Sequence, residues 1–145
     1  MALVYFDSSA FVKLLVQEAG SDVADQLWDG CDAAVSSRLA YPEVRAALAA
    51  ATRNHLLDVH DLGQAERAWE EYWAATRHVE LTPAVARSAG ERAGLHNLSG
   101  ADAVHLASAL AIDESDLIVA VWDRRLHAGA RAAHLRVAPA RPEDQ

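Results

Sequence analysis

The sequence has few cysteines, no long apolar runs and few lysines, and the first two shortages exclude classes of protein. Cys31 is the single cysteine, so no disulfide can form within the chain. No apolar run approaches the roughly twenty residues that cross a bilayer, and the N-terminus lacks the charged and apolar regions of a signal peptide. We therefore expect a cytoplasmic protein that does not enter a membrane. Lysine is also scarce, since Lys13 is the only one among 13 basic residues.

Acidic residues outnumber basic ones by 21 to 13, which gives a formal net charge of −8. This balance argues against a protein that holds nucleic acid by covering its phosphates with cations. It does not exclude a nuclease, because grouped acids attract a divalent metal that can contact the phosphate. With 52% apolar residues the chain can bury a real core, and its length suits a single domain over residues 1–145.

Two short apolar runs each lead into an aspartate. Residues 3–6 are followed by Asp7, and residues 117–122 are followed by Asp123. Unbroken apolar runs of this length are typical of strands buried on both faces of a parallel sheet. Since functional groups collect beyond the carboxyl ends of such strands, we expect Asp7 and Asp123 to meet in one crevice.

Helical and strand-like segments alternate along the rest of the chain. Helices are expected near residues 8–19, 21–30, 39–55, 58–73, 83–95, 99–113 and 126–132, and further strands near 33–36, 79–81 and 135–137. Ser8 or Ser9 should cap the first helix. Residues 94–100 should form an interior loop, and the tail 138–145 should be frayed. This alternation predicts a three-layer α/β/α fold with a mainly parallel central sheet.

Two more acids, Glu43 and Asp102, fall in the first turns of predicted helices. Helix starts and strand exits share one rim of such a sheet, so these acids should gather with Asp7 and Asp123. Each acid also has a structural interpretation, as a cap, a turn residue or compensation for a helix dipole. Carboxylates about 4 Å apart repel by about 4 kcal/mol, so a cluster of four favours a bound cation. Oxygen-only ligands suit Mg²⁺ or Mn²⁺ better than zinc.

The order of these motifs resembles the PIN-domain ribonucleases, and specifically the VapC toxins of bacterial toxin–antitoxin pairs. The matching segments are residues 7–14, 41–48, 102–109 and 123–126, and the agreement in spacing covers essentially the whole domain. The resemblance implies a PIN fold and Mg²⁺- or Mn²⁺-dependent cleavage of structured cellular RNA, such as tRNA or rRNA. It also implies a VapB-type antitoxin that occupies the site, and a homodimer.

By position, the resemblance implies that the catalytic acids are Asp7, Glu43, Asp102 and Asp123, with Asp7 and Asp102 as direct metal ligands. Val121 departs from the family, which usually has Ser or Thr there, so Asp123 ranks behind the other acids.

Other polar residues near these acids are weaker candidates. Ser9 is available to orient Asp7. Arg124 and Arg125 are candidates to contact substrate phosphates or to hold the acids before metal arrives, and the alternative is that they are simply solvated. His105 lies one helical turn after Asp102, and a lone helix histidine is more typically a packing or hydrogen-bonding residue than a ligand.

Other functions stay open at this point. A PIN-fold partner protein that has lost catalysis is one, and Val121 is its only support in the sequence. An RNA-processing nuclease without an antitoxin is another. An aspartyl-phosphate phosphatase is disfavoured, because Ser9 stands where a second aspartate would follow the first strand.

Overall fold

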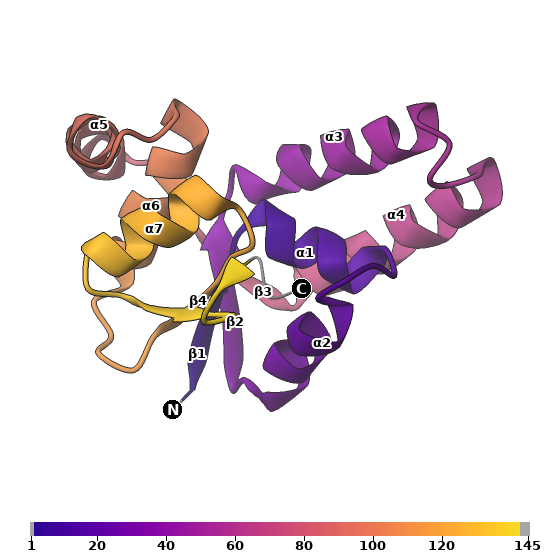
Figure 1. Cartoon of the computed structure of the whole chain (residues 1–145), viewed down its shortest axis with the longest axis horizontal. Helices are drawn as coiled ribbons and strands as arrows, with labels where there is room; N and C mark the ends of the chain where they lie inside the picture. The colour runs from indigo at the N-terminus through magenta and orange to yellow at the C-terminus, as the bar shows by residue number, and fades with distance from the viewer. Residues whose placement is uncertain (1, 143–145) are drawn as a thin grey trace.

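The computed structural model describes residues 2–142 (Figure 1). Its strands are β1 (Leu3–Phe6), β2 (Ala33–Ser37), β3 (Thr76–Val79), β4 (Ile118–Ala120) and β5 (Arg136–Ala138). Its helices are α1 (Ser8–Leu15), α2 (Ser21–Gly30), α3 (Ala40–Arg53), α4 (Val59–Ala74), α5 (Pro83–His96), α6 (Gly100–Ile112) and α7 (Arg124–Ala132). Every strand pairing among these residues is parallel, so the predicted fold class is confirmed.

The sheet has the strand order β3-β2-β1-β4-β5. The chain builds outward from β1 through β2 to β3 and then returns to place β4 on the other side of β1. The carboxyl ends of β1 and β4 therefore lie side by side at the point where the strand order reverses, which is where open α/β sheets form their crevice. Phe6 is in register with Ala120, so Asp7 and Val121 leave the sheet at the same level.

Side chains of β1 alternate between two apolar cores, as the period of a strand requires. Leu3 and Tyr5 pack with residues of α5, α6 and α7, whereas Val4 and Phe6 pack with residues of α1, α3 and α4. Figure 1 shows these two groups of helices on opposite sides of the sheet. Both faces of β1 are thus covered, which explains its unbroken apolar sequence.

The aromatic residues Trp69 and Trp73 of α4 belong to the hydrophobic core. Trp69 is fully buried, Trp73 is buried, and the Trp69 ring meets the Phe11 ring edge-on with centroids 4.8 Å apart. These rings pack α4 against α1 within the chain.

Three local predictions were wrong. The third strand covers Thr76–Val79 rather than residues 79–81, because Thr76 is the buried member that pairs with β2, whereas Leu81 is 53% exposed. The first helix is capped by Asp7, not by Ser8 or Ser9. α5 extends to His96, so the predicted loop from residue 94 is shorter.

The end of the chain is also more ordered than predicted. Ala138 belongs to β5 and its carbonyl accepts a hydrogen bond from the Val121 N–H at 3.0 Å, while Pro139 is buried. The predicted fraying is therefore wrong for these two residues, and residues 143–145 lie outside the described part. Within residues 2–142, no helix combines the length and apolar character needed to cross a bilayer.

Candidate active site

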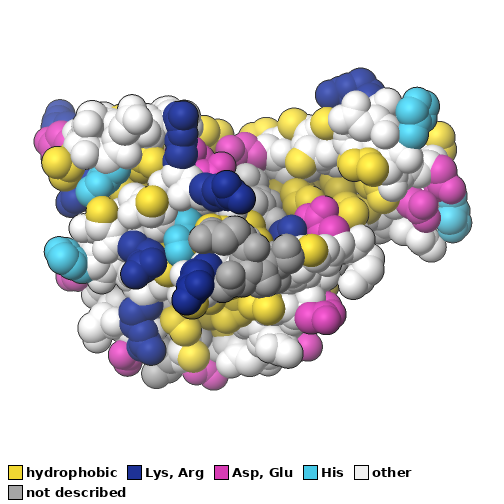
Figure 2. All heavy atoms as spheres, in the orientation of Figure 1, with side chains coloured by type: hydrophobic (Ala, Val, Ile, Leu, Met, Phe, Trp, Pro, Cys, Tyr) yellow, Lys and Arg dark blue, Asp and Glu magenta, His cyan; other side chains and the backbone are white. Residues whose placement is uncertain are grey.

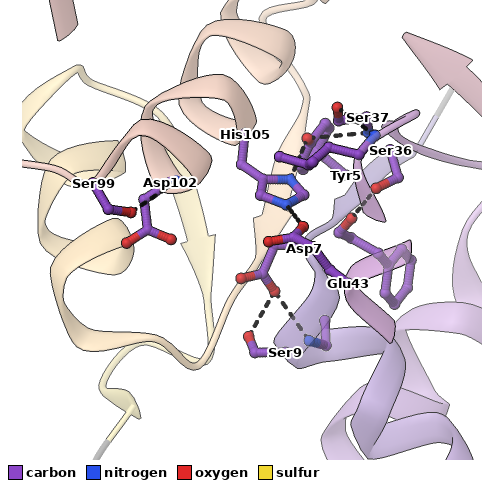
Figure 3. A network of polar contacts seen from close by, with 12 residues as sticks. Tyr5, Asp7, Ser9, Ser36, Ser37, Glu43, Ser99, Asp102 and His105 are labelled. Atoms are coloured by element: carbon purple, nitrogen blue, oxygen red, sulfur yellow. Dashed lines mark hydrogen bonds and ion pairs between the residues drawn. The ribbon is translucent and has the colours of Figure 1, made fainter. Parts of the chain in front are cut away.

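Asp7 is a buried carboxylate at the exit of β1 (Figure 3). Its Oδ1 accepts hydrogen bonds from the Ser9 hydroxyl at 2.6 Å and from the Ala10 N–H at 3.0 Å. Burial raises the pKa of Asp7 to about 6, and nearby Asp123 adds to this rise, although His105 and the two hydrogen bonds oppose it. The fold thus holds a carboxyl that titrates near neutral pH, which is unusual for aspartate.

Ser9 links the exits of β1 and β4. Its hydroxyl donates to Asp7 and accepts a hydrogen bond from the Trp122 N–H at 3.0 Å. Val121 is fully buried in the apolar core beside α5, α6 and α7, so it offers the site no polar group. Asp123 is fixed in another way: it caps α7, and its Oδ1 accepts from the Leu126 N–H at 2.9 Å.

A hydrogen bond between Glu43 and His105 joins α3 to α6, which lie on opposite sides of the sheet. His105 Nε2 lies 2.6 Å from Glu43 Oε1, and His105 Nδ1 lies 2.7 Å from the Tyr5 hydroxyl. The Tyr5 oxygen also accepts a hydrogen bond from the buried Ser37 N–H at 3.2 Å. A chain of polar groups therefore runs from β2 through β1 and α6 to the first turn of α3 (Figure 3).

This chain of polar groups determines which atoms of Tyr5 and His105 carry protons. Burial raises the pKa of Tyr5 well above its ordinary value, so the hydroxyl stays protonated and donates to Nδ1 whenever His105 is neutral. In that state the ring proton of His105 is on Nε2, which donates a hydrogen bond to Glu43. Burial alone would lower the pKa of His105, but its hydrogen bond to Glu43 and the charges of Asp7 and Asp102 outweigh burial and raise it. In either protonation state Nε2 donates to Glu43.

Asp102 lies in the first turn of α6, one turn before His105, and both face the same side of the helix. The Asp102 N–H donates to the Ser99 hydroxyl at 3.2 Å, so Ser99 caps the N-terminus of α6. Burial raises the pKa of the Asp102 carboxyl, and the charges of Asp123 and Glu43 raise it further. Asp123 therefore interacts electrostatically with both Asp7 and Asp102, and Glu43 interacts with Asp102.

The sequence did not identify two residues, His105 and Tyr5, as members of the hydrogen-bond network at the site. His105 was expected to be a packing or hydrogen-bonding residue, and it does bond, but it bonds to one of the candidate acids. Tyr5 lies in the strand predicted at residues 3–6, and the sequence assigned it no role in the site. A signal existed for both: His105 is one helical turn after Asp102, and Tyr5 is two residues before Asp7, which places it on the face of β1 toward α6.

The two candidate arginines take no part in this network. Arg124 and Arg125 are exposed, and neither forms an ion pair with any of residues 2–142. His105, rather than an arginine, is the basic group that contacts the acids.

The carboxylate oxygens at this site supply some of the ligands that a hard divalent cation needs. Asp7 and Asp102 offer carboxylate oxygens, and Oδ2 of Asp7 is left without a hydrogen-bond donor from residues 2–142. No three acidic, histidine or cysteine side chains of that part of the chain form a ready-made metal cage. Two carboxylates nevertheless suffice for Mg²⁺, which usually keeps several waters and shares its ligands with substrate phosphates.

Comparisons with known proteins agree with this fold. The PIN domain model matches residues 4–131. Ribonuclease VapC45 of Mycobacterium tuberculosis (strain CDC 1551 / Oshkosh) is 69% identical over 140 residues, which cover 97% of this chain and 97% of that protein. The chain belongs to the PIN-domain family, and within it to the VapC-type ribonuclease toxins.

Solved structures share the fold at lower identity. Mycobacterium tuberculosis VapC20, described as a toxin that cleaves the sarcin–ricin loop, has a TM-score of 0.66 at 18% identity, with 86% of this chain and 93% of that chain covered. A toxin–antitoxin complex from Klebsiella pneumoniae gives a TM-score of 0.62 at 18% identity, with coverages of 87% and 91%.

Proposed function

We propose that this chain is an endoribonuclease toxin that requires Mg²⁺, or Mn²⁺ in its place, and hydrolyses structured cellular RNA, either tRNA or rRNA. The observation that carries the proposal is Asp7: a buried carboxylate, fixed by Ser9, with its pKa raised to about 6 and three further acids nearby. Holding these charges together costs stability, and a divalent cation would offset that cost.

In this proposal, Asp7 and Asp102 hold the cation. When bound, a divalent ion supplies Lewis-acid stabilisation of the phosphoryl charge and activation of water. Ser9 keeps Oδ1 of Asp7 occupied and so leaves Oδ2 as the oxygen that would hold the ion. Asp123 adds negative charge at the rim, and its raising effect on the pKa values of Asp7 and Asp102 supports that role.

Glu43 is the proposed proton acceptor. His105 Nε2 donates to Oε1 of Glu43, which leaves Oε2 to accept a proton from the attacking water. The side chain is 26% exposed, so water can reach it, whereas His105 is buried and cannot contact substrate. His105 and Tyr5 are therefore positioning residues.

The relatives support RNA and an antitoxin as partners. VapC45 is named a ribonuclease, and the Klebsiella structure is a toxin–antitoxin complex. We propose that RNA is the substrate, and that a VapB-type antitoxin covers the acids. We also propose a homodimer, as the resemblance to the VapC toxins implies. Co-purification with the product of a small neighbouring reading frame, followed by mass measurement in solution, tests both.

The direct test is cleavage of tRNA and rRNA with Mg²⁺ by the native chain, Asp7→Asn and Asp102→Asn. Both variants should lose cleavage. Asp116→Asn is the matched control, because Asp116 is exposed and follows the opposite end of α6. Undiminished cleavage by Asp7→Asn and Asp102→Asn would contradict the assignment of these acids.

A second candidate is a PIN-fold partner protein with weakened catalysis. The observation in its favour is Val121, which is buried in the apolar core where a hydroxyl would be expected near Asp123. Thermal unfolding with and without Mg²⁺ separates the candidates, because only a working site should bind the ion and gain stability. Absence of both Mg²⁺ stabilisation and RNA cleavage would favour the partner protein.

A further inference from the structure

A cavity of about 390 Å³ lies between α7 and the segment after β5. Its walls include three arginines, Arg124, Arg131 and Arg141, together with His127 and Ala128. We call this cavity the arginine pocket. It contains none of the four candidate acids, but it begins at Arg124, the residue that follows Asp123.

The regular geometry of α7 builds one wall of the pocket. Arg124, Ala128 and Arg131 are spaced at i, i+4 and i+7 and therefore share one face of the helix. Ala128 is short, which leaves space between the two guanidinium groups. His127 is buried and its Nε2 donates to the Pro139 carbonyl at 2.8 Å, which fixes the segment that forms the opposite wall.

Two of the three arginines, Arg124 and Arg131, have charges that no ion pair within the described chain balances. Arg124 and Arg131 are exposed and form no ion pair with any of residues 2–142, whereas Arg38 and Arg45 each pair with a glutamate. Arg124 also lies at the N-terminus of α7, the positive end of the helix dipole, where a cation is unfavourable. Such a placement is costly for the fold and favours an anionic ligand.

We propose that the arginine pocket binds a backbone phosphate of the RNA, next to the phosphate that is cleaved; this rests on the proposed function. The planar guanidinium fork matches phosphate oxygens better than a lysine ammonium does. Figure 2 shows Lys and Arg side chains (dark blue) gathered over α7 and the segment beside it, with Asp and Glu side chains (magenta) adjoining them. An RNA strand that reaches the acids through a bound cation therefore meets the guanidinium groups directly beside them.

A purely structural role makes a different prediction. Arg131 is in the last turn of α7, where a cation compensates the helix dipole by about 0.3–1 kcal/mol. In that case Arg131→Gln would lower stability and leave RNA affinity unchanged. A phosphate contact instead makes RNA affinity and its dependence on salt the quantities that change.

The test measures equilibrium binding of a fluorescent tRNA or rRNA hairpin by anisotropy, in EDTA, between 50 and 300 mM KCl. At about 150 mM salt, Arg131→Gln should weaken binding about tenfold, and its slope of log affinity against log salt should fall by about 0.7. Adding Arg124→Gln should weaken binding further, and Arg131→Lys should restore most of the slope. Arg53→Gln is the charge-matched control, because Arg53 is exposed at the far end of α3.

Binding by both glutamine variants with the affinity and slope of Arg53→Gln would overturn the pocket assignment.

Cleavage is measured separately with Mg²⁺, where Arg131→Gln should raise KM and retain kcat. Arginine-dependent binding without cleavage by the native chain would refute the proposed nuclease and leave the pocket standing as an RNA-binding site. Cleavage with arginine-independent binding would refute the pocket alone. Displacement of RNA by inorganic phosphate at low millimolar concentration, to the same extent from the native chain and from Arg131→Gln, would also overturn the assignment, because the phosphate-sensitive contact would then lie outside the pocket.

Discussion

Replacing Asp7 by Asn should make the metal-free protein more stable at pH 8, and the gain should shrink as the pH falls. Burial raises the pKa of Asp7 from 3.8 to about 6 in the folded chain. Between these values the unfolded chain releases a proton that the folded chain keeps, so stability falls as pH rises through this window. Below it the carboxyl is protonated in both states, and above it the full cost is present.

The magnitude follows from the size of the shift. One pKa unit corresponds to about 1.4 kcal/mol, so ionised Asp7 costs the folded state on the order of 3 kcal/mol above about pH 7. Asn is as good a helix cap as Asp and carries no charge, so Asp7→Asn keeps the cap of α1 and removes that cost. For a chain of this size, 3 kcal/mol corresponds to roughly 6–12 °C in Tm.

The assay is thermal or urea unfolding of the native chain and Asp7→Asn in EDTA, at half-unit steps from pH 4.5 to 8. The stability gap should widen from roughly 1 to roughly 3 kcal/mol and then level off. Asp116→Asn, which changes an exposed carboxyl, should show no such widening. A variant that is less stable than the native chain, by an amount independent of pH, would refute the reasoning and leave Asp7 as a simple cap.

Two further substitutions test the hydrogen-bond network. Tyr5→Phe removes the hydroxyl that Ser37 N–H and His105 Nδ1 contact, and should lower the free energy of unfolding by about 1–3 kcal/mol, measured by urea unfolding; an unchanged midpoint would mean that water replaces the hydroxyl. Ser9→Ala removes a hydrogen bond that lowers the pKa of Asp7 in the folded chain, so the pH range over which stability falls should extend to higher pH. Mg²⁺ affinity measured by thermal shift should fall roughly 10- to 100-fold, and equal affinity would show that Ser9 does not orient Asp7.

The sequence predicts those elements whose apolar pattern and burial coincide. β1 and β4 are covered on both faces, so their apolar runs identify them without knowledge of the fold. β3 is an edge strand in which Arg77 is exposed, and its position depends on pairing with β2, which local apolarity does not encode. The first helix cap was misplaced for a similar reason, because Asp7, Ser8 and Ser9 are all good caps and only the position of α1 against the sheet selects one.

The candidate site was predictable to the extent that it depends on chain order. Asp7, Glu43, Asp102 and Asp123 follow strands or begin helices, and the topology of a parallel sheet brings such positions to one rim. The contact between His105 and Glu43 spans 62 positions of sequence and that between His105 and Tyr5 spans 100, and no local pattern specifies either pairing. The acids can thus be read from motif order, whereas the groups that set their protonation require the packed structure.

The hydrogen-bond network also bears on Val121, which stands where the family usually has Ser or Thr. A hydroxyl at that position would lie near the exit of β4 and could join it to the acidic rim. In this chain the Ser9 hydroxyl already spans both exits, since it accepts from the Trp122 N–H and donates to Asp7. Asp123 is held independently by its own cap bond to the Leu126 N–H. Loss of a hydroxyl at position 121 therefore leaves the two acids at the strand exits connected through Ser9, so Val121 alone is a weak reason to expect an inactive site.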